Sequence, residues 1–152
     1  MRTPSRARDY LRLLSLGVLS VTTLMILTGS PRADDGKARP NSGILMSRDL
    51  AGAPGKEALV ITVEYPPGGA SAPHRHDASV FVYVLEGSVV MQVDGKPAET
   101  LAAGQTFYEG PDDVHRVSKN ASATQPAKLL VFMVKDKGKP ATRLVPSGPS
   151  SP

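Results

Sequence analysis

Short apolar segments separated by glycine- and proline-rich turns run through the chain from Ala58 onward, and they limit its fold more than any other feature. The first segment, ALVITVEY at 58–65, is rich in β-branched residues and ends at the breaker Pro66-Pro67-Gly68-Gly69. Similar segments follow, namely VFVYVLEG, SVVMQV, ETL, QTFYE, HRVS and KLLVFMV. Helical periodicity is missing from this part of the sequence. Regularly spaced short strands of this kind predict an antiparallel all-β sandwich or barrel.

The first 33 residues have a different character. Four arginines and one aspartate in residues 1–12 precede the uncharged stretch LLSLGVLSVTTLMILT at 13–28. A basic flank followed by such a stretch is typical of an export signal, whereas a full membrane span needs about 20 apolar residues. We therefore predict a signal peptide over residues 1–33, cleaved after Ala33, and export to the periplasm or cell envelope. An uncleaved N-terminal membrane-anchor helix is the alternative.

The remaining chain divides into three parts by composition. Residues 34–57 are polar and rich in turn formers, and we interpret them as a linker or arm that lies across the domain. Residues 58–134 contain the predicted strands and form the β domain. Residues 135–152 carry four prolines and are predicted to be a disordered tail.

Charge and cysteine content exclude several classes of function. Of the 18 basic and 14 acidic residues, five basic and one acidic lie in residues 1–33, which leaves 13 of each in the rest of the chain. A neutral domain without a basic cluster is a poor phosphate binder, so nucleic acid is not expected as a partner, and a membrane is expected to contact only the N-terminal segment. The chain has no cysteine, which excludes a disulfide framework, a thiolate nucleophile and an iron–sulfur cluster.

Three histidines are the strongest candidates for chemistry. His74 and His76 are separated by one residue, so in a strand they point the same way, with Cα atoms about 6.6 Å apart, and can converge on one metal ion. His115 follows a Gly-Pro-Asp-Asp turn and is the candidate third ligand. A histidine pair on an exposed loop is also often only solvated or hydrogen-bonded. The spacing alone therefore leaves both a metal site and a structural role open.

The residues around the histidines resemble the two signature motifs of the cupin superfamily. Gly68, His74, His76 and Gly87 follow the spacing of the first motif, and GQTFYEGPDDVHRVSKN at 104–120 resembles the second. The resemblance implies a small single-domain cupin, with a jelly-roll β-barrel over residues 58–134. It also implies that the three histidines surround a divalent metal ion (Fe, Mn or Zn) at the barrel mouth, and that the protein can form a homodimer.

The first motif departs from the family at one position. Cupins normally carry a metal-binding glutamate four residues after the second histidine, and that position is Val80 here. The neighbouring acid Asp77 directly follows His76, so alternation sends its side chain to the opposite face. Glu109, on the strand before the second turn, is an additional candidate ligand, although strand parity does not fix its face. Some thiol and diketone dioxygenases of the superfamily use three histidines with iron(II), so oxygen chemistry stays open.

The apolar residues between the motifs suggest a substrate pocket. If the histidines face inward, the pocket walls are formed by Val80, Val82, Met91 and Phe107. Such walls suit a hydrophobic or aromatic small molecule. Together, the N-terminal segment and the resemblance predict an exported cupin that binds a divalent metal and acts on a small molecule. If it is an enzyme, a dioxygenase-like oxidoreductase is the expected class. A non-catalytic cupin of the cell envelope that binds a metal or small ligand is the alternative, and a metal-free structural cupin is a third interpretation.

Overall fold

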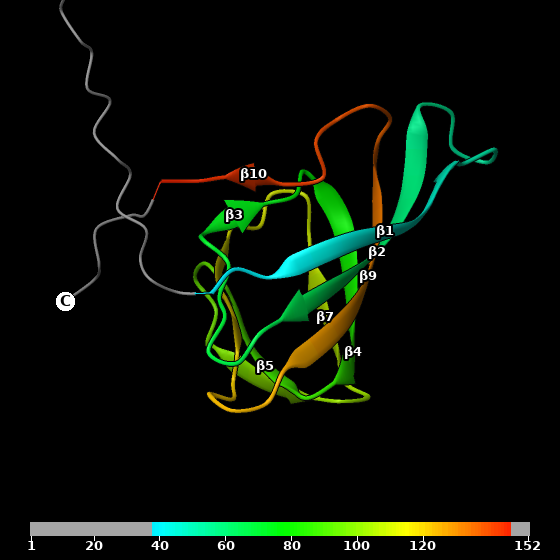
Figure 1. Cartoon of the computed structure of the whole chain (residues 1–152). Helices are drawn as coiled ribbons and strands as arrows, with labels where there is room; N and C mark the ends of the chain where they lie inside the picture. The colour runs from blue at the N-terminus through cyan, green and yellow to red at the C-terminus, as the bar shows by residue number, and fades with distance from the viewer. Residues whose placement is uncertain (1–37, 147–152) are drawn as a thin grey trace, which may run out of the picture. The chain divides into compact units, whose positions relative to one another are not determined.

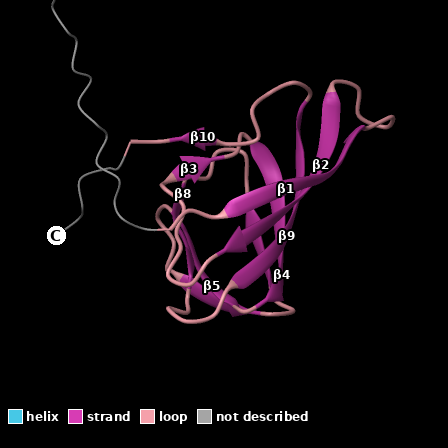
Figure 2. Cartoon of the chain, viewed as in Figure 1, coloured by secondary structure: helices cyan, strands magenta, loops and turns pink. Residues whose placement is uncertain are grey.

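The computed structural model describes residues 38–146, which form ten strands and no helix (Figures 1 and 2). The strands are β1 (Asn41–Asp49), β2 (Lys56–Tyr65), β3 (His74–Arg75), β4 (Ala78–Glu86), β5 (Ser88–Val93), β6 (Glu99–Ala102), β7 (Thr106–Glu109), β8 (His115–Asn120), β9 (Ala127–Asp136) and β10 (Arg143–Leu144). This range accordingly offers no helix that could span a membrane. The predicted signal peptide or anchor over residues 1–33 and the last six residues of the predicted tail lie outside the described residues.

The strands form two five-stranded sheets that face each other, as in a sandwich. One sheet, here called sheet A, has the order β1-β2-β9-β4-β7, and the other, sheet B, has the order β10-β3-β8-β5-β6. Every strand pairing is antiparallel. The predicted all-β antiparallel sandwich is therefore confirmed for the described part of the chain.

The core lies between the sheets and follows from alternation along the central strands. On β4, Val80, Val82 and Val84 are buried, and on the neighbouring β9 the buried residues include Val131 and Met133. The side chains between them point to the outside of sheet A. Burying each valine or methionine contributes about 1.5–3 kcal/mol, so this period-two pattern fixes the register of the two strands.

The chain passes from sheet A to sheet B at Gly87, between β4 and β5. Gly87 has a φ of 71°, and a Cβ at this position would lie 2.5 Å from the carbonyl oxygen of Pro126. Only glycine fits both the left-handed backbone and this close approach. The turn holds the inner faces of β4 and β5 toward the same interior.

Two strands lie outside residues 58–134, the range predicted for the β domain. Residues 41–49, inside the predicted linker, form β1 and pair with β2 over nearly its whole length. All nine residues of β1 are exposed, so this edge strand lacks the burial pattern that reveals a strand in a sequence. Residues Arg143 and Leu144, inside the predicted disordered tail, form β10 and pair with β3.

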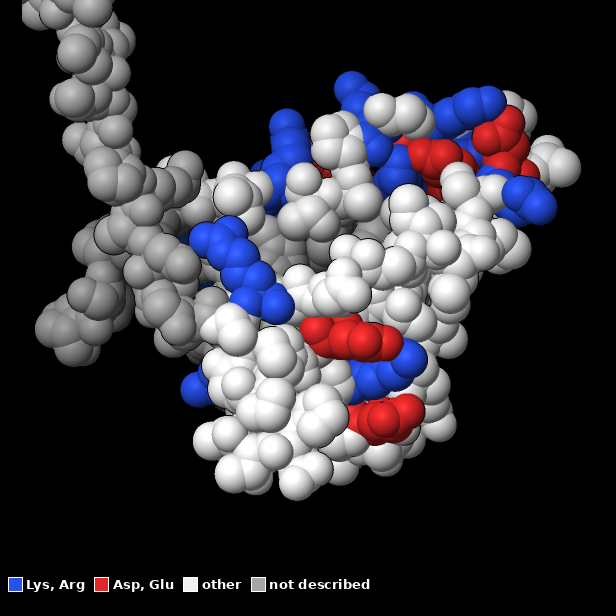
Figure 3. Space-filling view, in the orientation of Figure 1, with Lys and Arg blue, Asp and Glu red and all other residues white. Residues whose placement is uncertain are grey.

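Charged side chains of both signs are intermixed on the surface. Figure 3 shows their densest group over the end of the molecule where β1 leads into β2. Ion pairs at this end join Lys56 of β2 to Asp136 of β9, and Lys137, which follows β9, to Asp49 of β1. The nearly buried Lys135 pairs with Glu57 and also donates to the carbonyl oxygen of Lys139 at 2.6 Å. This network ties β2 to the end of β9.

Candidate metal centre

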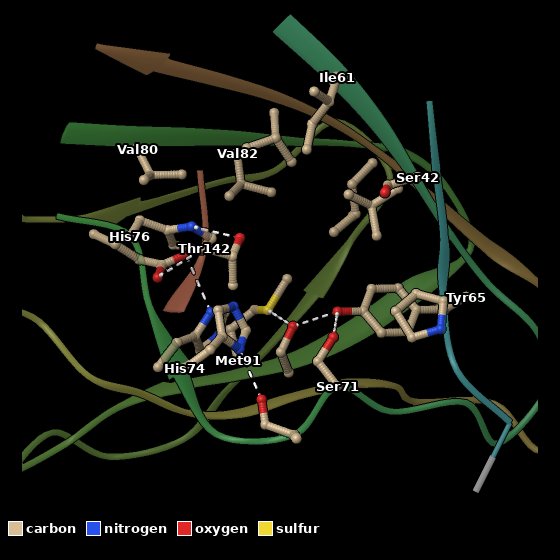
Figure 4. A pocket seen from close by; sticks show the side chains of 18 of the residues that line it. Ser42, Ile61, Tyr65, Ser71, His74, His76, Val80, Val82, Met91 and Thr142 are labelled. Carbon is tan, nitrogen blue, oxygen red and sulfur yellow. Dashed lines mark hydrogen bonds and ion pairs between the residues drawn. The ribbon is translucent and has the colours of Figure 1, made fainter. Parts of the chain in front are cut away.

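The three histidines are brought together by one short pairing in sheet B. His74 on β3 pairs directly with His115 on β8, and His76 follows two residues after His74. All three side chains are buried, and one ring nitrogen from each lies within 4.8 Å of the others. Figure 4 shows His74 and His76 at one end of a pocket. The structure therefore brings together the three histidines that are the candidate ligands.

Backbone carbonyl groups fix the tautomers of two of the histidines. The Nδ1 atom of His74 lies 2.8 Å from the carbonyl oxygen of Ala72, and Nδ1 of His76 lies 2.7 Å from that of Ala141. A carbonyl oxygen only accepts hydrogen bonds, so each Nδ1 must donate its proton. The Nε2 atoms then keep their lone pairs for a metal ion.

Burial also keeps His74 neutral. Desolvation lowers its pKa to about 4, and the neighbouring His76 and His115 add to the lowering, although the hydrogen bond to Ala72 opposes it. A neutral imidazole is the form that binds metal ions. His74 is therefore ready to act as a ligand at neutral pH without first losing a proton.

A carboxylate reaches the histidines from sheet A. Glu109 on β7 is only 2% exposed, and its Oε1 atom lies 3.1 Å from Nδ1 of His115. Its Oε2 atom lies 3.7 Å from Nε2 of His76. Burial raises the pKa of Glu109, but the close contact with His115 and the other imidazoles lowers it by more, so the net pKa is below the ordinary value. Glu109 therefore presents an ionised carboxylate to the histidines.

Several polar atoms in this cluster have no hydrogen-bond partner among the described residues. They are Oε2 of Glu109 and both ring nitrogens of His115, and all three are buried. The contact between Nδ1 of His115 and Oε1 of Glu109 is short, but its geometry is not that of a hydrogen bond. Leaving a buried polar atom unpaired costs about 1–3 kcal/mol, so native proteins normally satisfy such atoms with a ligand, a water molecule or an ion. Three imidazoles and one carboxylate are donors that first-row divalent metals accept. The residues present thus fit a metal ion.

The cluster opens into a cavity of about 290 Å³ between the two sheets. Of the predicted pocket residues, Val80, Val82 and Met91 line this cavity. Phe107 does not line it; its ring instead stacks on His115 with the ring centres 5.8 Å apart, and it contributes to a second hollow on sheet A. Alternation along the strand does not show whether the ring of Phe107 lines the cavity or the second hollow, because Phe107 lies on a short strand at the sheet edge.

Three hydroxyls line the cavity together with the histidines, and no sequence motif indicates them. The hydroxyl of the buried Tyr65 lies 2.8 Å from Oγ of Ser71 and 2.6 Å from Oγ of Ser118 (Figure 4). Burial raises the pKa of Tyr65, and the two serine contacts only partly oppose this. Tyr65 therefore stays protonated and offers a hydrogen-bonding group rather than a base.

The acid next to His76 takes no part in the site. Asp77 has a φ of 49° and forms ion pairs with Arg75 and Arg143, and it does not line the cavity. Arg143 belongs to β10, the strand next to the Ala141 carbonyl that orients His76. The segment around β10 therefore supports the histidines, a role that its proline-rich composition did not reveal.

The comparisons with known proteins agree with this geometry. Residues 61–133, which span β2 to β9 and include all three histidines and Glu109, match the family model of the cupin domain. A comparison with proteins of curated function gave no match.

Solved structures with the same fold come from several sources. A DMSP lyase from Ruegeria pomeroyi superposes with a TM-score of 0.58 at 21% identity, over 76% of this chain and 56% of the lyase chain. An uncharacterised protein with a double-stranded β-helix domain from Klebsiella pneumoniae has a TM-score of 0.55 at 19% identity, over 76% of this chain and 90% of its own. An oxalate oxidase in complex with glycolate has a TM-score of 0.51 at 22% identity, over 68% of this chain and 54% of the oxidase. The chain thus spans little more than half of the lyase and the oxidase, and these likenesses show the fold.

Proposed function

The chain belongs to the cupin family through its domain at residues 61–133, and we propose that it is an exported metal-dependent cupin that binds a small organic acid and acts on it. The observation that carries the proposal is the set of unpaired atoms in the cluster. Oε2 of Glu109 and both ring nitrogens of His115 are buried without a hydrogen-bond partner among residues 38–146. A divalent ion would engage Oε2 of Glu109 and one ring nitrogen of His115, together with the free Nε2 atoms of His74 and His76.

In this proposal the metal is held by His74, His76, His115 and Glu109. The donor set of three nitrogens and one oxygen suits Fe, Mn or Zn. The net charge of such a centre with one carboxylate is +1, so it favours an anionic ligand in the adjoining cavity. When bound, the ion would supply Lewis-acid or redox chemistry to a ligand held beside it.

The rest of the cavity describes the ligand. Between the histidines and the hydroxyls of Tyr65, Ser71 and Ser118, the cavity walls are aliphatic. Ile61, Val82 and Val131 form part of these walls. Tyr65 offers a polar hydroxyl within the same cavity. A small acid with a short uncharged body fits this combination, because an apolar wall favours carbon and a few fixed polar groups orient the ends. Glycolate, which the related oxalate oxidase carries, is a suitable first probe.

The type of reaction is limited by the titratable side chains that line the cavity and do not bind the metal. Among the described residues that line the cavity, the titratable side chains are the three histidines, Glu109, Tyr65 and Arg39. With four of them on the metal and Tyr65 protonated, none remains as a general base at neutral pH. This favours oxidoreductase chemistry of the dioxygenase type over side-chain proton transfer. The same observation supports the alternative, a cell-envelope cupin that binds its ligand without converting it.

Export rests on the N-terminal sequence. The basic and apolar order of residues 1–28 is that of a signal peptide, with the membrane anchor as the alternative. Mass spectrometry of the protein isolated from the periplasm would give its first residue and so test the expected cleavage after Ala33.

The function is tested first by metal analysis. The protein is purified from cells grown with iron, manganese and zinc, and its metal content is measured beside His76→Ala and the control Glu64→Gln, whose carboxylate pairs with Lys128 and lies outside the cavity. About one ion per chain that is lost only in His76→Ala supports the proposed centre. Oxygen uptake with glycolate or oxalate then separates an oxidoreductase from a binder. A wild-type protein that takes up no metal even after reconstitution contradicts the proposal.

A further inference from the structure

A chain of hydrogen bonds with a fixed direction lies at the polar end of the cavity. The hydroxyl of Tyr65 contacts Oγ of Ser71 at 2.8 Å and Oγ of Ser118 at 2.6 Å (Figure 4). Oγ of Ser118 also lies 3.5 Å from the sulfur of Met91, and because a thioether has no proton, Ser118 is the donor there. Each hydroxyl has one proton, so Tyr65 must donate to Ser118, and Ser71 must donate to Tyr65. All three donors therefore point from Ser71 toward Met91.

This direction leaves the three hydroxyls with acceptors only. Their protons are all used within the chain, so the groups that remain toward the cavity are oxygen lone pairs, most of them on Ser71, which accepts no bond from the other two. Tyr65 is 3% exposed and Ser118 is 5% exposed, and both line the cavity. Buried acceptors favour a partner that brings its own proton. This end of the cavity therefore favours a ligand group that donates a hydrogen bond.

The hydroxyl chain and the histidines share the inner face of sheet B. Met91 on β5 pairs with Ser118, and Val93 pairs with His115, so β8 advances three residues where β5 advances two. This β-bulge turns Ser118 and His115 into the same cavity, although an interval of three residues would send them to opposite faces of a regular strand. The interval on β5 spans about 7 Å along the sheet. The backbone N–H of Ser71 donates to the carbonyl oxygen of Ser118 at 2.9 Å and holds the chain in place. One short molecule can therefore reach both groups.

Charge selects a neutral donor over an ammonium group or a second carboxylate. Among the described residues that line the cavity, Glu109 is the one carboxylate, and it belongs to the histidine cluster. An ammonium group beside the hydroxyls would therefore be buried without an anionic partner, which is costly. A carboxylate is ionised at neutral pH, has no proton to donate and would face the lone pairs. Arg39 also lines the cavity, but its side chain is exposed and its charge is screened by water. A hydroxyl donates a proton without carrying a charge.

We propose that the ligand is a short hydroxy acid whose carboxylate lies at the histidine cluster and whose hydroxyl donates to the chain of Ser71, Tyr65 and Ser118. Its carbon atoms lie along the aliphatic walls between these two groups. The carboxylate end of this ligand depends on the metal centre of the proposed function, whereas the hydroxyl end depends on the hydroxyl chain alone. The chain thus determines specificity: it selects hydroxy acids over unsubstituted acids, amino acids and dicarboxylic acids of the same length.

The selection is tested by isothermal titration calorimetry on the Zn²⁺-loaded protein, because zinc has no redox chemistry and no oxidation then accompanies binding. Butanoate, 4-hydroxybutanoate, 4-aminobutanoate and succinate share a four-carbon chain that keeps the second group away from the metal. We expect 4-hydroxybutanoate to bind roughly fivefold more tightly than the other three, the factor that one net hydrogen bond contributes. Equal affinities for butanoate and 4-hydroxybutanoate, or tightest binding of succinate, overturn the selection and leave the metal centre standing. A protein that binds neither zinc nor any of the acids overturns both.

Two variants test the hydroxyl chain itself. In Ser71→Ala the preference for 4-hydroxybutanoate over butanoate should disappear, while the affinity for butanoate stays the same. The matched control is Ser42→Ala, whose hydroxyl lines the same cavity outside the chain and whose loss should leave the preference intact. Met91→Leu removes the acceptor of Ser118 and frees its proton, so the affinity for succinate should rise roughly fivefold. Metal content and circular dichroism report folding. A folded Ser71→Ala variant that keeps the preference, or a folded Met91→Leu variant with unchanged succinate binding, overturns the proposal.

Discussion

Val80 on β4 and Glu109 on β7 lie directly opposite each other in sheet A. Directly paired residues point to the same face, with Cβ atoms about 4.5–5.5 Å apart. Val80 occupies the position at which cupins usually carry a metal-binding glutamate, and Glu109 contacts His115 and His76 from the neighbouring strand. We infer that the carboxylate of this centre comes from the adjacent strand rather than from the first motif.

Because Val80 and Glu109 are paired, the metal affinity should survive a transfer of the carboxylate from position 109 to position 80. Glu109→Val should weaken metal binding by roughly 10-fold or more, because it removes an anionic donor and the close partner of His115. The double variant Val80→Glu/Glu109→Val should recover most of that loss, since the carboxylate returns to the same space from the paired position. Competition with a fluorescent chelator measures both affinities.

The control for this exchange is Val82→Glu/Glu109→Val. Val82 pairs with Phe107 rather than with Glu109, so its carboxylate enters the cavity at a different level. Equal recovery in this control, or no recovery with Val80→Glu, would show that Glu109 acts in another way than as a donor at this position.

The sequence predicted those parts of the fold and site in which a residue type recurs at a regular spacing. Glycine and proline turns with alternating valines predicted the sandwich, and the resemblance to the two cupin motifs predicted that His74, His76 and His115 converge. The contribution of Glu109 could not be fixed, because it depends on the register between β4 and β7, which alternation within one strand does not give. The three hydroxyls of Tyr65, Ser71 and Ser118 come from β2, a loop and β8, which lie far apart in the sequence, so no local pattern indicates that they meet. The exposed strand β1 carried no burial period from which it could be recognised.

Tyr65 provides a prediction on ligand binding. Tyr65→Phe removes the hydroxyl that contacts Ser71 and Ser118 but keeps the ring that fills the wall. We expect metal content to stay at the wild-type level and the affinity for a small hydroxy acid such as glycolate to fall roughly 5- to 10-fold, because a net hydrogen bond contributes about 1 kcal/mol. Isothermal calorimetry on the metal-loaded protein measures the change. A loss of metal in Tyr65→Phe would instead indicate that the variant disturbs the centre itself.

The core of sheet A provides a prediction on stability. Met133 is fully buried and pairs with Leu59 on one side and Val80 on the other. Met133→Ala should lower the free energy of unfolding by about 2–5 kcal/mol, because it removes buried methylene groups and leaves a cavity. The exposed Leu144→Ala serves as the control and should change stability by about 0.5 kcal/mol or less. Urea denaturation followed by circular dichroism measures both, and equal effects would contradict the described packing.

The ion pair between Glu57 and Lys135 predicts a loss of stability in acid. The hydrogen bond from Lys135 holds the pKa of Glu57 below its ordinary value of 4.5. A carboxyl group whose pKa is lower in the folded state stabilises the fold above its unfolded pKa, and this contribution is lost as the pH falls through the folded pKa. The difference in unfolding free energy between wild type and Glu57→Gln should therefore be constant from pH 8 to about 5 and shrink below about 4.5. Urea titrations at each pH measure it, and a difference that grows toward low pH would contradict this assignment.

The segment around β10 provides the last prediction, because it joins the end of the chain to the metal centre. The carbonyl oxygen of Ala141 accepts from Nδ1 of His76, and Leu144 pairs with His74. A chain that ends at Lys139 loses both contacts, so His76 is no longer held in the tautomer that leaves Nε2 free. We expect metal affinity to fall roughly 10- to 100-fold, as for other partners that orient metal ligands, while the strands of sheet A stay folded. A chain that ends at Pro146 keeps β10 and is the control, and chelator competition beside thermal unfolding compares the two. If both chains bound metal equally well, the hydrogen bond from His76 to Ala141 would have no part in preparing the site.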